Sequence, residues 1–509
     1  MINKTILFFP LNSPGHINSS LGIADVMKRE FNCRTVFLIL GKMMGTSVAD
    51  RGHELIMLSE ANPLQDYAIE EHEDPGEPID VEAKIRAGKE KQTFEGTFKW
   101  PQLVRRAARW LQLPPVEAFL ASAHIFEQQM IGELIENHQN YARAIESIGP
   151  DLLIIDAYYV PPCVLKLQVP WVRLYSANPL MLVESKLANK AKPAPMIGFQ
   201  LFDKQKRELM RQSEPDRWQR MVGEWSETCG KIAAAIGQAG QRLNEFLLEQ
   251  QCSPLEPGKQ AHDSPHLNVY MFPEALDYAQ DDDLFEYPPL WLRCDSMLRA
   301  QPQVASREAI ELQFWEEKLQ RARQNKEAVV FFSLGSLASG QVNLMKRFVD
   351  LLRNDTKRLY VFSKGANGNQ YQLDEANMIG DNYIPQTFFL ERANLAIIHG
   401  GNNSITECAF YGLPMIVLPV FGDQLDNGQR VEDLKLGRRL DVHTCTGAQL
   451  LGAIGDILSD QPMRDRLKLI GQKMRSRDDR RRVSSLLAKL ANEGALDRAD
   501  IETYRKESS

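Results

Sequence analysis

Residues Asn382–Asn427 read NYIPQTFFLERANLAIIHGGNNSITECAFYGLPMIVLPVFGDQLDN and carry the clearest structural signal in the chain. The apolar run Asn394–Ile398 predicts a buried strand, Met415–Leu418 predicts a second strand, and the residues between them predict a helix. Two glycines follow the first strand directly, which lets the backbone come close to a bulky group. This alternation is typical of a parallel, doubly wound α/β sheet.

Polar residues recur at every loop on one edge of this predicted sheet. His399 follows the first strand, and Asn403 and Ser404 begin the next helix, where free N–H groups and the positive dipole end attract anions. Ligands of open α/β sheets bind at this carboxyl edge. A plain capped turn would explain the Gly-Gly pair but not the whole recurring set. That set is Tyr383, Gln386, His399, Asn403, Ser404, Glu407, Asp423 and Gln424.

The order of these residues resembles the donor-binding signature of the UDP-dependent glycosyltransferases that act on small lipophilic acceptors. That signature is an aromatic residue, Pro-Gln, a strand, His-x-Gly-x-Asn-Ser-x-x-Glu, a strand ending in Pro, then Asp-Gln and Asn. The chain looks more similar to soluble members, such as bacterial and mite enzymes, than to membrane-anchored animal ones. The resemblance implies the GT-B fold, in which two Rossmann-like α/β domains face each other across a cleft.

The resemblance also implies a role for each residue of the signature. Tyr383 would stack on uracil, where plant members carry Trp, and the backbone of Ile384 would pair with the base. Gln386 and Glu407 would hold the ribose hydroxyls. The diphosphate contacts would be Ser336, His399, Gly401, Asn402, Asn403 and Ser404. The sugar would be held by Asp423 and Gln424, a pair that favours glucose.

A candidate base lies near the start of the chain. The loop after the predicted strand Thr5–Phe9 contains Pro-Gly-His16-x-Asn, which resembles the catalytic loop of the same family. A histidine suits proton abstraction from a hydroxyl near pH 7. Asp156 ends the predicted strand Leu152–Ile155, and a neighbouring parallel strand would bring it beside His16. Asp156 would then fix the tautomer of His16 and stabilise its imidazolium form.

From the alternation of elements we predict an acceptor-binding domain over 1–280, a linker over 281–306 and a donor-binding domain over 307–475. The resemblance implies that the last helical segment, 476–509, packs back on the first domain. The aromatic-rich stretch 62–140 interrupts the first α/β series. It is interpreted either as local core or as the wall of an apolar acceptor pocket.

Composition limits the partners. The 509 residues carry a net charge of −7 without a large basic block, so no nucleic-acid partner is expected. The seven cysteines are odd in number and form no CxxC pair, which favours free thiols in a reducing compartment. No run approaches the roughly 20 apolar residues of a membrane span, and no signal-peptide pattern opens the chain. We therefore expect a cytoplasmic protein that binds a UDP-sugar and a small lipophilic or phenolic acceptor, with no metal and no other cofactor.

Three other functions fit the sequence less well. A UDP-sugar epimerase of the same fold would need no acceptor pocket, which the aromatic-rich stretch disfavours. A non-catalytic sugar-nucleotide-binding protein would need neither His16 nor Asp156. A dinucleotide oxidoreductase would carry GxGxxG after a leading strand, and no such motif is present there. The prediction is an inverting hexosyltransferase.

Overall fold

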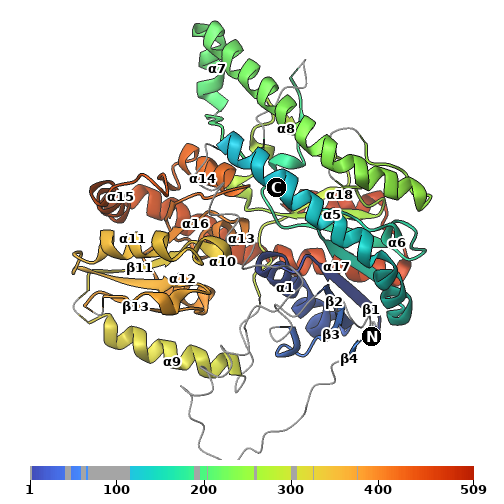
Figure 1. The fold of residues 1–509 in the computed structure, drawn as a ribbon, viewed down its shortest axis with the longest axis horizontal. Coiled ribbons are helices and arrows are strands. Elements are labelled where there is room, and N and C mark those ends of the chain that lie inside the picture. The colour runs from blue at the N-terminus through green and yellow to red at the C-terminus, as the bar shows by residue number, and fades with distance from the viewer. Residues whose placement is uncertain are drawn as a thin grey trace, which may run out of the picture.

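The computed structural model describes residues 3–40, 48–58, 65–66, 115–187, 195–202, 204–256, 259, 261–299, 307–324, 326–374 and 376–508. Within these ranges the chain forms two α/β domains, which occupy opposite sides of Figure 1. Each domain is built on a largely parallel sheet. The predicted pair of Rossmann-like domains is therefore confirmed.

The first sheet has the strand order β10-β8-β6-β5-β1-β2-β3-β4, and its neighbours are parallel except β3 and β4. Its strands are β1 (Thr5–Pro10), β2 (Arg34–Leu40), β3 (Glu54–Leu58), β4 (Gln65–Asp66), β5 (Leu152–Asp156), β6 (Trp171–Tyr175), β8 (Leu267–Met271) and β10 (Trp291–Cys294). The strand order reverses between β1 and β5, so the crevice at their carboxyl ends is the expected ligand position of this sheet.

The second sheet has the order β13-β12-β11-β14-β15-β16. Its strands are β11 (Ala328–Ser333), β12 (Arg358–Ser363), β13 (Met378–Asp381), β14 (Leu395–Ile398), β15 (Met415–Val417) and β16 (Gly437–Arg439). Every residue of β11, β14 and β15 is buried, as expected for parallel strands covered on both faces. Here the order reverses between β11 and β14, and the loops after these two strands carry Ser336 and His399.

Helices cover both sheets. In the first domain they are α1 (Pro14–Phe31), α5 (Pro115–Ile148), α6 (Pro162–Leu165), α7 (Lys204–Ser213) and α8 (Pro215–Glu249). In the second they are α9 (Arg307–Ala322), α10 (Gly335–Ala338), α11 (Val342–Leu352), α12 (Gln386–Arg392), α13 (Asn402–Tyr411), α14 (Gln424–Asp433), α15 (Gly447–Ser459) and α16 (Gln461–Arg477). The long helix α8 packs along α5, and α7 leads into it at the edge of the molecule (Figure 1).

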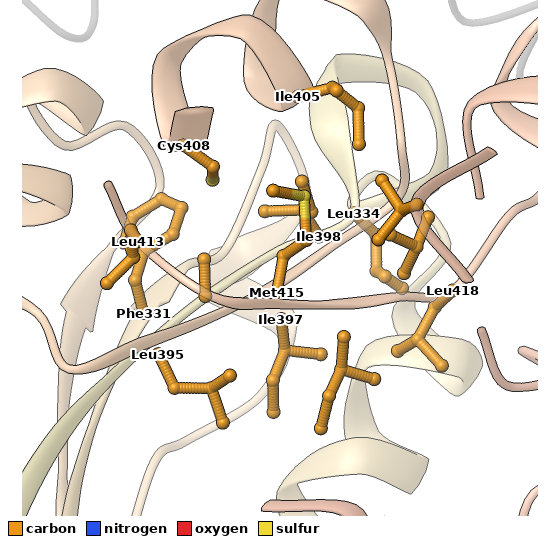
Figure 2. Close-up of a cluster of buried hydrophobic side chains, with 14 of the residues drawn as sticks. Phe331, Leu334, Leu395, Ile397, Ile398, Ile405, Cys408, Leu413, Met415 and Leu418 are labelled. Atoms are coloured by element: carbon orange, nitrogen blue, oxygen red, sulfur yellow. The ribbon is translucent and has the colours of Figure 1, made fainter. Parts of the chain in front are cut away.

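Helix α13 is held on the second sheet by an apolar cluster. Ile405 and Cys408 on α13 pack with Ile398 of β14 and Met415 of β15, and all four side chains are fully buried (Figure 2). The two isoleucines and Met415 each contribute roughly 1.5–3 kcal/mol by leaving water. The helix ends at Gly412, whose φ of 68° is the left-handed conformation that glycine tolerates. The amino end of α13 is thus anchored at the carboxyl edge of the sheet.

The predicted linker over 281–306 is partly wrong. It contains the short strand β9 (Phe285–Glu286) and also β10, which pairs with β8 in the first sheet. Trp291 and Cys294 of β10 are buried, but the polar, proline-containing residues before them hid this four-residue strand in the sequence. The first domain therefore continues to Cys294, and the chain crosses to the second domain between Cys294 and α9.

The last two helices, α17 (Asp479–Glu493) and α18 (Arg498–Ser508), lie on the first domain. Val483, Leu487 and Leu490 share a buried cluster with Ile6 and other residues of the first sheet. The Tyr504 hydroxyl donates a hydrogen bond to the Arg293 carbonyl of β10 (2.6 Å). The chain therefore crosses between the domains twice, so they are joined at two points.

The domains also meet where α14 contacts a loop of the first domain. The buried carboxylate of Asp426 accepts hydrogen bonds from the backbone N–H groups of Met196 (2.5 Å) and Gly198 (2.8 Å). Asp433 accepts from Leu201 N (3.0 Å). The helix that opens with Gln424 is thereby held directly by the first domain.

Gly198 lies at this contact and leaves no room for a larger side chain. Its φ is +74°, and a Cβ there would lie 2.7 Å from the Leu425 carbonyl oxygen. We expect Gly198→Ala to destabilise the chain by about 2–4 kcal/mol, since positive φ and overpacking both cost energy. Gly223→Ala is the matched control, because a Cβ on this helical glycine meets nothing within 4 Å. Urea unfolding of both variants tests this, and equal stability would contradict it.

Candidate active site

The two residues predicted as the base pair lie together. β1 pairs with β5 so that Pro10 is opposite Asp156, and His16 follows on the first turns of α1. His16 Nδ1 lies 2.9 Å from Asp156 Oδ1. The Asp156 side chain is 2% exposed and that of His16 is 13% exposed. The predicted contact is confirmed, and the imidazole keeps some access to solvent.

The carboxylate changes the proton affinity of the imidazole. Burial lowers the pKa of His16, but the charge and hydrogen bond of Asp156, with a contribution from Asp423, outweigh it and raise the pKa above 6.5. The ring of Tyr158 meets the imidazole edge-on, with 5.6 Å between the ring centroids. His16 is therefore a stronger base than a free histidine and lies beside an aromatic surface.

Sequence reasoning missed Ser176, which touches both members of this pair. Its hydroxyl donates to Asp156 Oδ2 (2.7 Å), and Oγ lies 3.1 Å from His16 Nδ1. Ser176 directly follows β6, which pairs with β5. Because the carboxyl ends of parallel strands share one edge, a polar residue after the next strand was the signal that could have revealed it.

In the second domain, His399 follows β14 and its ring is flanked by Gly335 and Gly401. A Cβ on Gly335 or on Gly401 would lie 2.5 Å from His399 Nε2. The absence of a side chain at Gly335 and Gly401 therefore makes room for the imidazole of His399. Burial lowers the pKa of His399 to about 4, so the ring is neutral at pH 7. Among the described residues, its buried Nδ1 has no hydrogen-bond partner.

The residues assigned to the ribose form a cluster. Gln386 Nε2 donates to Glu407 Oε2 (2.6 Å) and to Ser404 Oγ (3.2 Å). Burial raises the pKa of Glu407, while the Gln386 hydrogen bond and the charge of Arg299 oppose that rise. A carboxylate held in this way accepts hydrogen bonds from two vicinal hydroxyls readily.

The aromatic and backbone positions of the donor signature also lie at this end. Tyr383 and Ile384 are half-buried and immediately precede Pro385, the residue that caps α12. Burial raises the pKa of the Tyr383 phenol, so it is uncharged at neutral pH. Ser336 is half-buried in the short helix α10, directly after β11. The roles of these residues toward uracil and phosphate stay predictions.

The asparagines assigned to the diphosphate join the two domains in this structure. Asn402 Nδ2 donates to the Met271 carbonyl (2.8 Å), and Asn403 Nδ2 donates to the Gly15 carbonyl (2.8 Å). Ser19 Oγ donates to Asn403 Oδ1 (3.1 Å). The amino ends of α1 and α13 are thus bridged directly, one residue before His16. Contact of Asn402 and Asn403 with phosphate stays a prediction.

The residues assigned to the sugar are held from two sides. Asp423 Oδ2 accepts from the backbone N–H of Asn178 in the first domain (3.0 Å). Gln424 Oε1 accepts from the N–H groups of Val420 (3.0 Å) and Phe421 (3.2 Å), so it shapes its own loop. Burial raises the pKa of Asp423 to about 6. Asp423 is the second carboxylate that acts on His16.

A small pocket lies between the two domains, next to the Glu407 carboxylate. Its polar lining comes from both domains and includes Asn18, Arg299, Asn403, Thr406 and Glu407. The buried oxygens Asn18 Oδ1 and Thr406 Oγ1 have no hydrogen-bond partner among the described residues. The aromatic-rich stretch predicted as core or acceptor wall lies largely outside the described residues, over 67–114.

Comparisons with solved structures define the class of fold. The alignment with the glycotransferase of kitacinnamycin covers 96% of this chain and 99% of that protein, with a TM-score of 0.57 and 18% sequence identity. The alignment with CalG4, the calicheamicin glycosyltransferase, covers 96% of this chain and 98% of that protein, with a TM-score of 0.55 and 15% sequence identity. The fold is that of the GT-B glycosyltransferases.

Residues 304–471, which make up most of the second domain, match the family model described as UDP-glucoronosyl and UDP-glucosyl transferase. An uncharacterized UDP-glucosyltransferase, YojK of Bacillus subtilis (strain 168), is 26% identical over 153 residues, 30% of this chain and 38% of its own. UDP-glucuronosyltransferase 2B13 of Oryctolagus cuniculus is 31% identical over 142 residues, 26% of this chain and 25% of its own. These matches span well under half of each relative. Within the described ranges, no helix is long and apolar enough to cross a membrane.

Proposed function

We propose that this chain transfers a hexose, glucose first, from a UDP-sugar to a hydroxyl group of a small lipophilic or phenolic acceptor. The observation that carries the proposal is the contact between the two candidate half-sites. Asn403, at the amino end of α13, donates to the carbonyl of Gly15, the residue before His16. The candidate base and the helix terminus that we assign to the diphosphate therefore lie next to each other between the domains.

In the proposed reaction, His16 removes the acceptor proton through Nε2 as the acceptor oxygen attacks the anomeric carbon. Asp156 accepts a hydrogen bond from the Nδ1–H of His16 and stabilises the imidazolium that forms. A positioned general base of this kind is worth about 10²–10⁴-fold in rate. Attack in line with the leaving group inverts the anomeric configuration. Tyr158 beside the imidazole favours an aromatic or apolar acceptor.

The leaving UDP would be stabilised by fixed groups of the second domain. The amino end of α13 offers backbone N–H groups and a positive dipole to a phosphate. Neutral His399 can donate a hydrogen bond without adding a charge. We therefore propose that transfer proceeds without a divalent metal. A cytoplasmic location stays a prediction.

Incubation of the protein with a panel of UDP-sugars and phenolic acceptors tests the function, with glycoside mass as the readout. We expect product with UDP-glucose and an anomeric configuration opposite to that of the donor, readable by NMR. If only another UDP-hexose gave product, the proposed sugar would be wrong but the proposed reaction, hexose transfer to a hydroxyl, would stand. Interconversion of UDP-sugars without any glycoside would favour an epimerase.

Excess EDTA should leave the initial rate unchanged, because the proposed leaving-group contacts are all protein groups. The rate is measured before and after dialysis against EDTA, and again after Mg²⁺ or Mn²⁺ is added back. A large loss that either ion restores would contradict this account of the leaving group.

A further inference from the structure

The hydroxyl of Ser176 limits the ways in which the proposed base pair can be protonated. Asp156 Oδ1 faces His16 Nδ1, while Asp156 Oδ2 accepts the hydroxyl proton of Ser176. Because that proton is donated to Asp156, the oxygen lone pairs of Ser176 remain for the proton on His16 Nδ1, 3.1 Å away. Two hydrogen-bond acceptors therefore face His16 Nδ1. This arrangement favours the tautomer in which Nδ1 carries the proton and Nε2 is unprotonated.

The same turn also reaches the other domain. Two residues after Ser176, the backbone N–H of Asn178 donates to Asp423 Oδ2. The Asn178 side chain donates to Asn427 Oδ1 (2.8 Å) on α14 and to the Tyr278 hydroxyl (3.1 Å). Asn178 is 1% exposed. One buried turn thus contacts both the base pair and the helix that carries the residues assigned to the sugar.

We propose that Ser176 is a positioning residue of the transfer reaction, holding Asp156 and His16 in the tautomer that accepts a proton at Nε2. The proposal rests on the proposed function and adds a third member to the pair. The charged groups that act on His16 are Asp156 from β5 and Asp423 from the start of α14, and Tyr158 packs against its ring. Ser176 contacts the first of these carboxylates, and its turn contacts the second.

Ser176→Ala should lower kcat about tenfold while the KM for the UDP-sugar stays unchanged, because every predicted donor contact lies in the second domain. A tenfold change corresponds to about 1.4 kcal/mol in the barrier. Ser176→Thr keeps the hydroxyl and should recover most of the rate. The acidic limb of the kcat/KM profile should shift in Ser176→Ala and return in Ser176→Thr.

Ser264→Ala is the matched control for the loss of a buried serine. Ser264 is 1% exposed, and its hydroxyl donates to the carbonyl of Trp171, at the start of the strand that Ser176 follows. That strand, β6, has five residues, so Trp171 and Ser176 lie about 17 Å apart at its opposite ends. Ser264→Ala should cost stability without moving the pH profile.

The tautomer is measured directly by NMR of the resting protein labelled with ¹⁵N-histidine, with the His16 signals assigned from His16→Gln. Wild type should show the proton on Nδ1, and Ser176→Ala should show a mixture and a changed titration midpoint. This readout does not require turnover, so it separates the failure of this proposal from the failure of the proposed function. An unchanged tautomer and midpoint, or equal rate loss in Ser176→Ala and the folded Ser176→Thr, would overturn it.

Discussion

His16→Ala should lower turnover on a phenolic acceptor by about 10²–10⁴-fold, the usual contribution of a positioned general base. UDP binding should survive, because every residue assigned to the donor lies in the second domain. Asp156→Asn should lose a substantial part of the same rate, since an amide can orient the imidazole but cannot stabilise its protonated form. Initial rates by mass spectrometry and UDP affinity by calorimetry measure the two effects separately.

The double variant is the sharper test of this pair. Residues that act as one unit are strongly non-additive, so the double variant should lose little beyond His16→Ala alone. If the two single losses simply multiplied, the two residues would act independently and the dyad would be wrong. If His16→Ala kept nearly wild-type turnover on a poorly acidic alcohol, another residue would have to be the general base.

The pH profile gives a further expectation with a definite sign. Asp156 raises the pKa of His16 above 6.5, and the active form of a base is the neutral one. Wild-type kcat/KM should therefore fall as the pH is lowered, with its acidic limb above pH 6.5. An acidic limb well below pH 6.5 would contradict the electrostatic role given to Asp156.

Glu407→Ala should weaken the binding of UDP itself by about 10²–10⁴-fold, because it removes a charged acceptor assigned to two ribose hydroxyls, and each such hydrogen bond contributes about 1.5–3 kcal/mol. It also leaves Gln386 without the partner that orients its amide. Isothermal titration with UDP measures the effect. Glu391→Ala is the matched control, since this exposed glutamate of the same domain pairs only with the neighbouring Arg392 among the described contacts.

Gln424→Ala provides the contrast at the opposite end of the donor. It should keep most of the UDP affinity and mainly lower sugar transfer, because Gln424 is assigned to the hexose. The structure adds a cost, since the N–H groups of Val420 and Phe421 lose their acceptor. Folding must therefore be checked by thermal unfolding. Equal loss of UDP affinity in Glu407→Ala and Gln424→Ala would show that the sugar end has been misassigned.

The sequence was sufficient for the parts of the molecule that follow from local periodicity and strand order. Continuous apolar runs such as Leu395–Ile398 specify buried parallel strands, and such strands bring their carboxyl ends to one edge. The contact between His16 and Asp156 could be predicted for that reason. The four-residue strand β10 could not, because a run so short and so closely preceded by prolines has no readable period.

The tertiary structure alone decided how the two half-sites are held against each other. Asn403 bonds to Gly15 across 388 positions of sequence, and Asn178 bonds to Asp423 across 245. Such pairs cannot be predicted from a local sequence pattern, since each depends on how the domains pack. The role of Ser176 has the same origin, because a serine after a strand becomes informative only when its neighbours in space are known. What the sequence determined was the set of chemical groups at each sheet edge; the packing of the domains determined which of them meet.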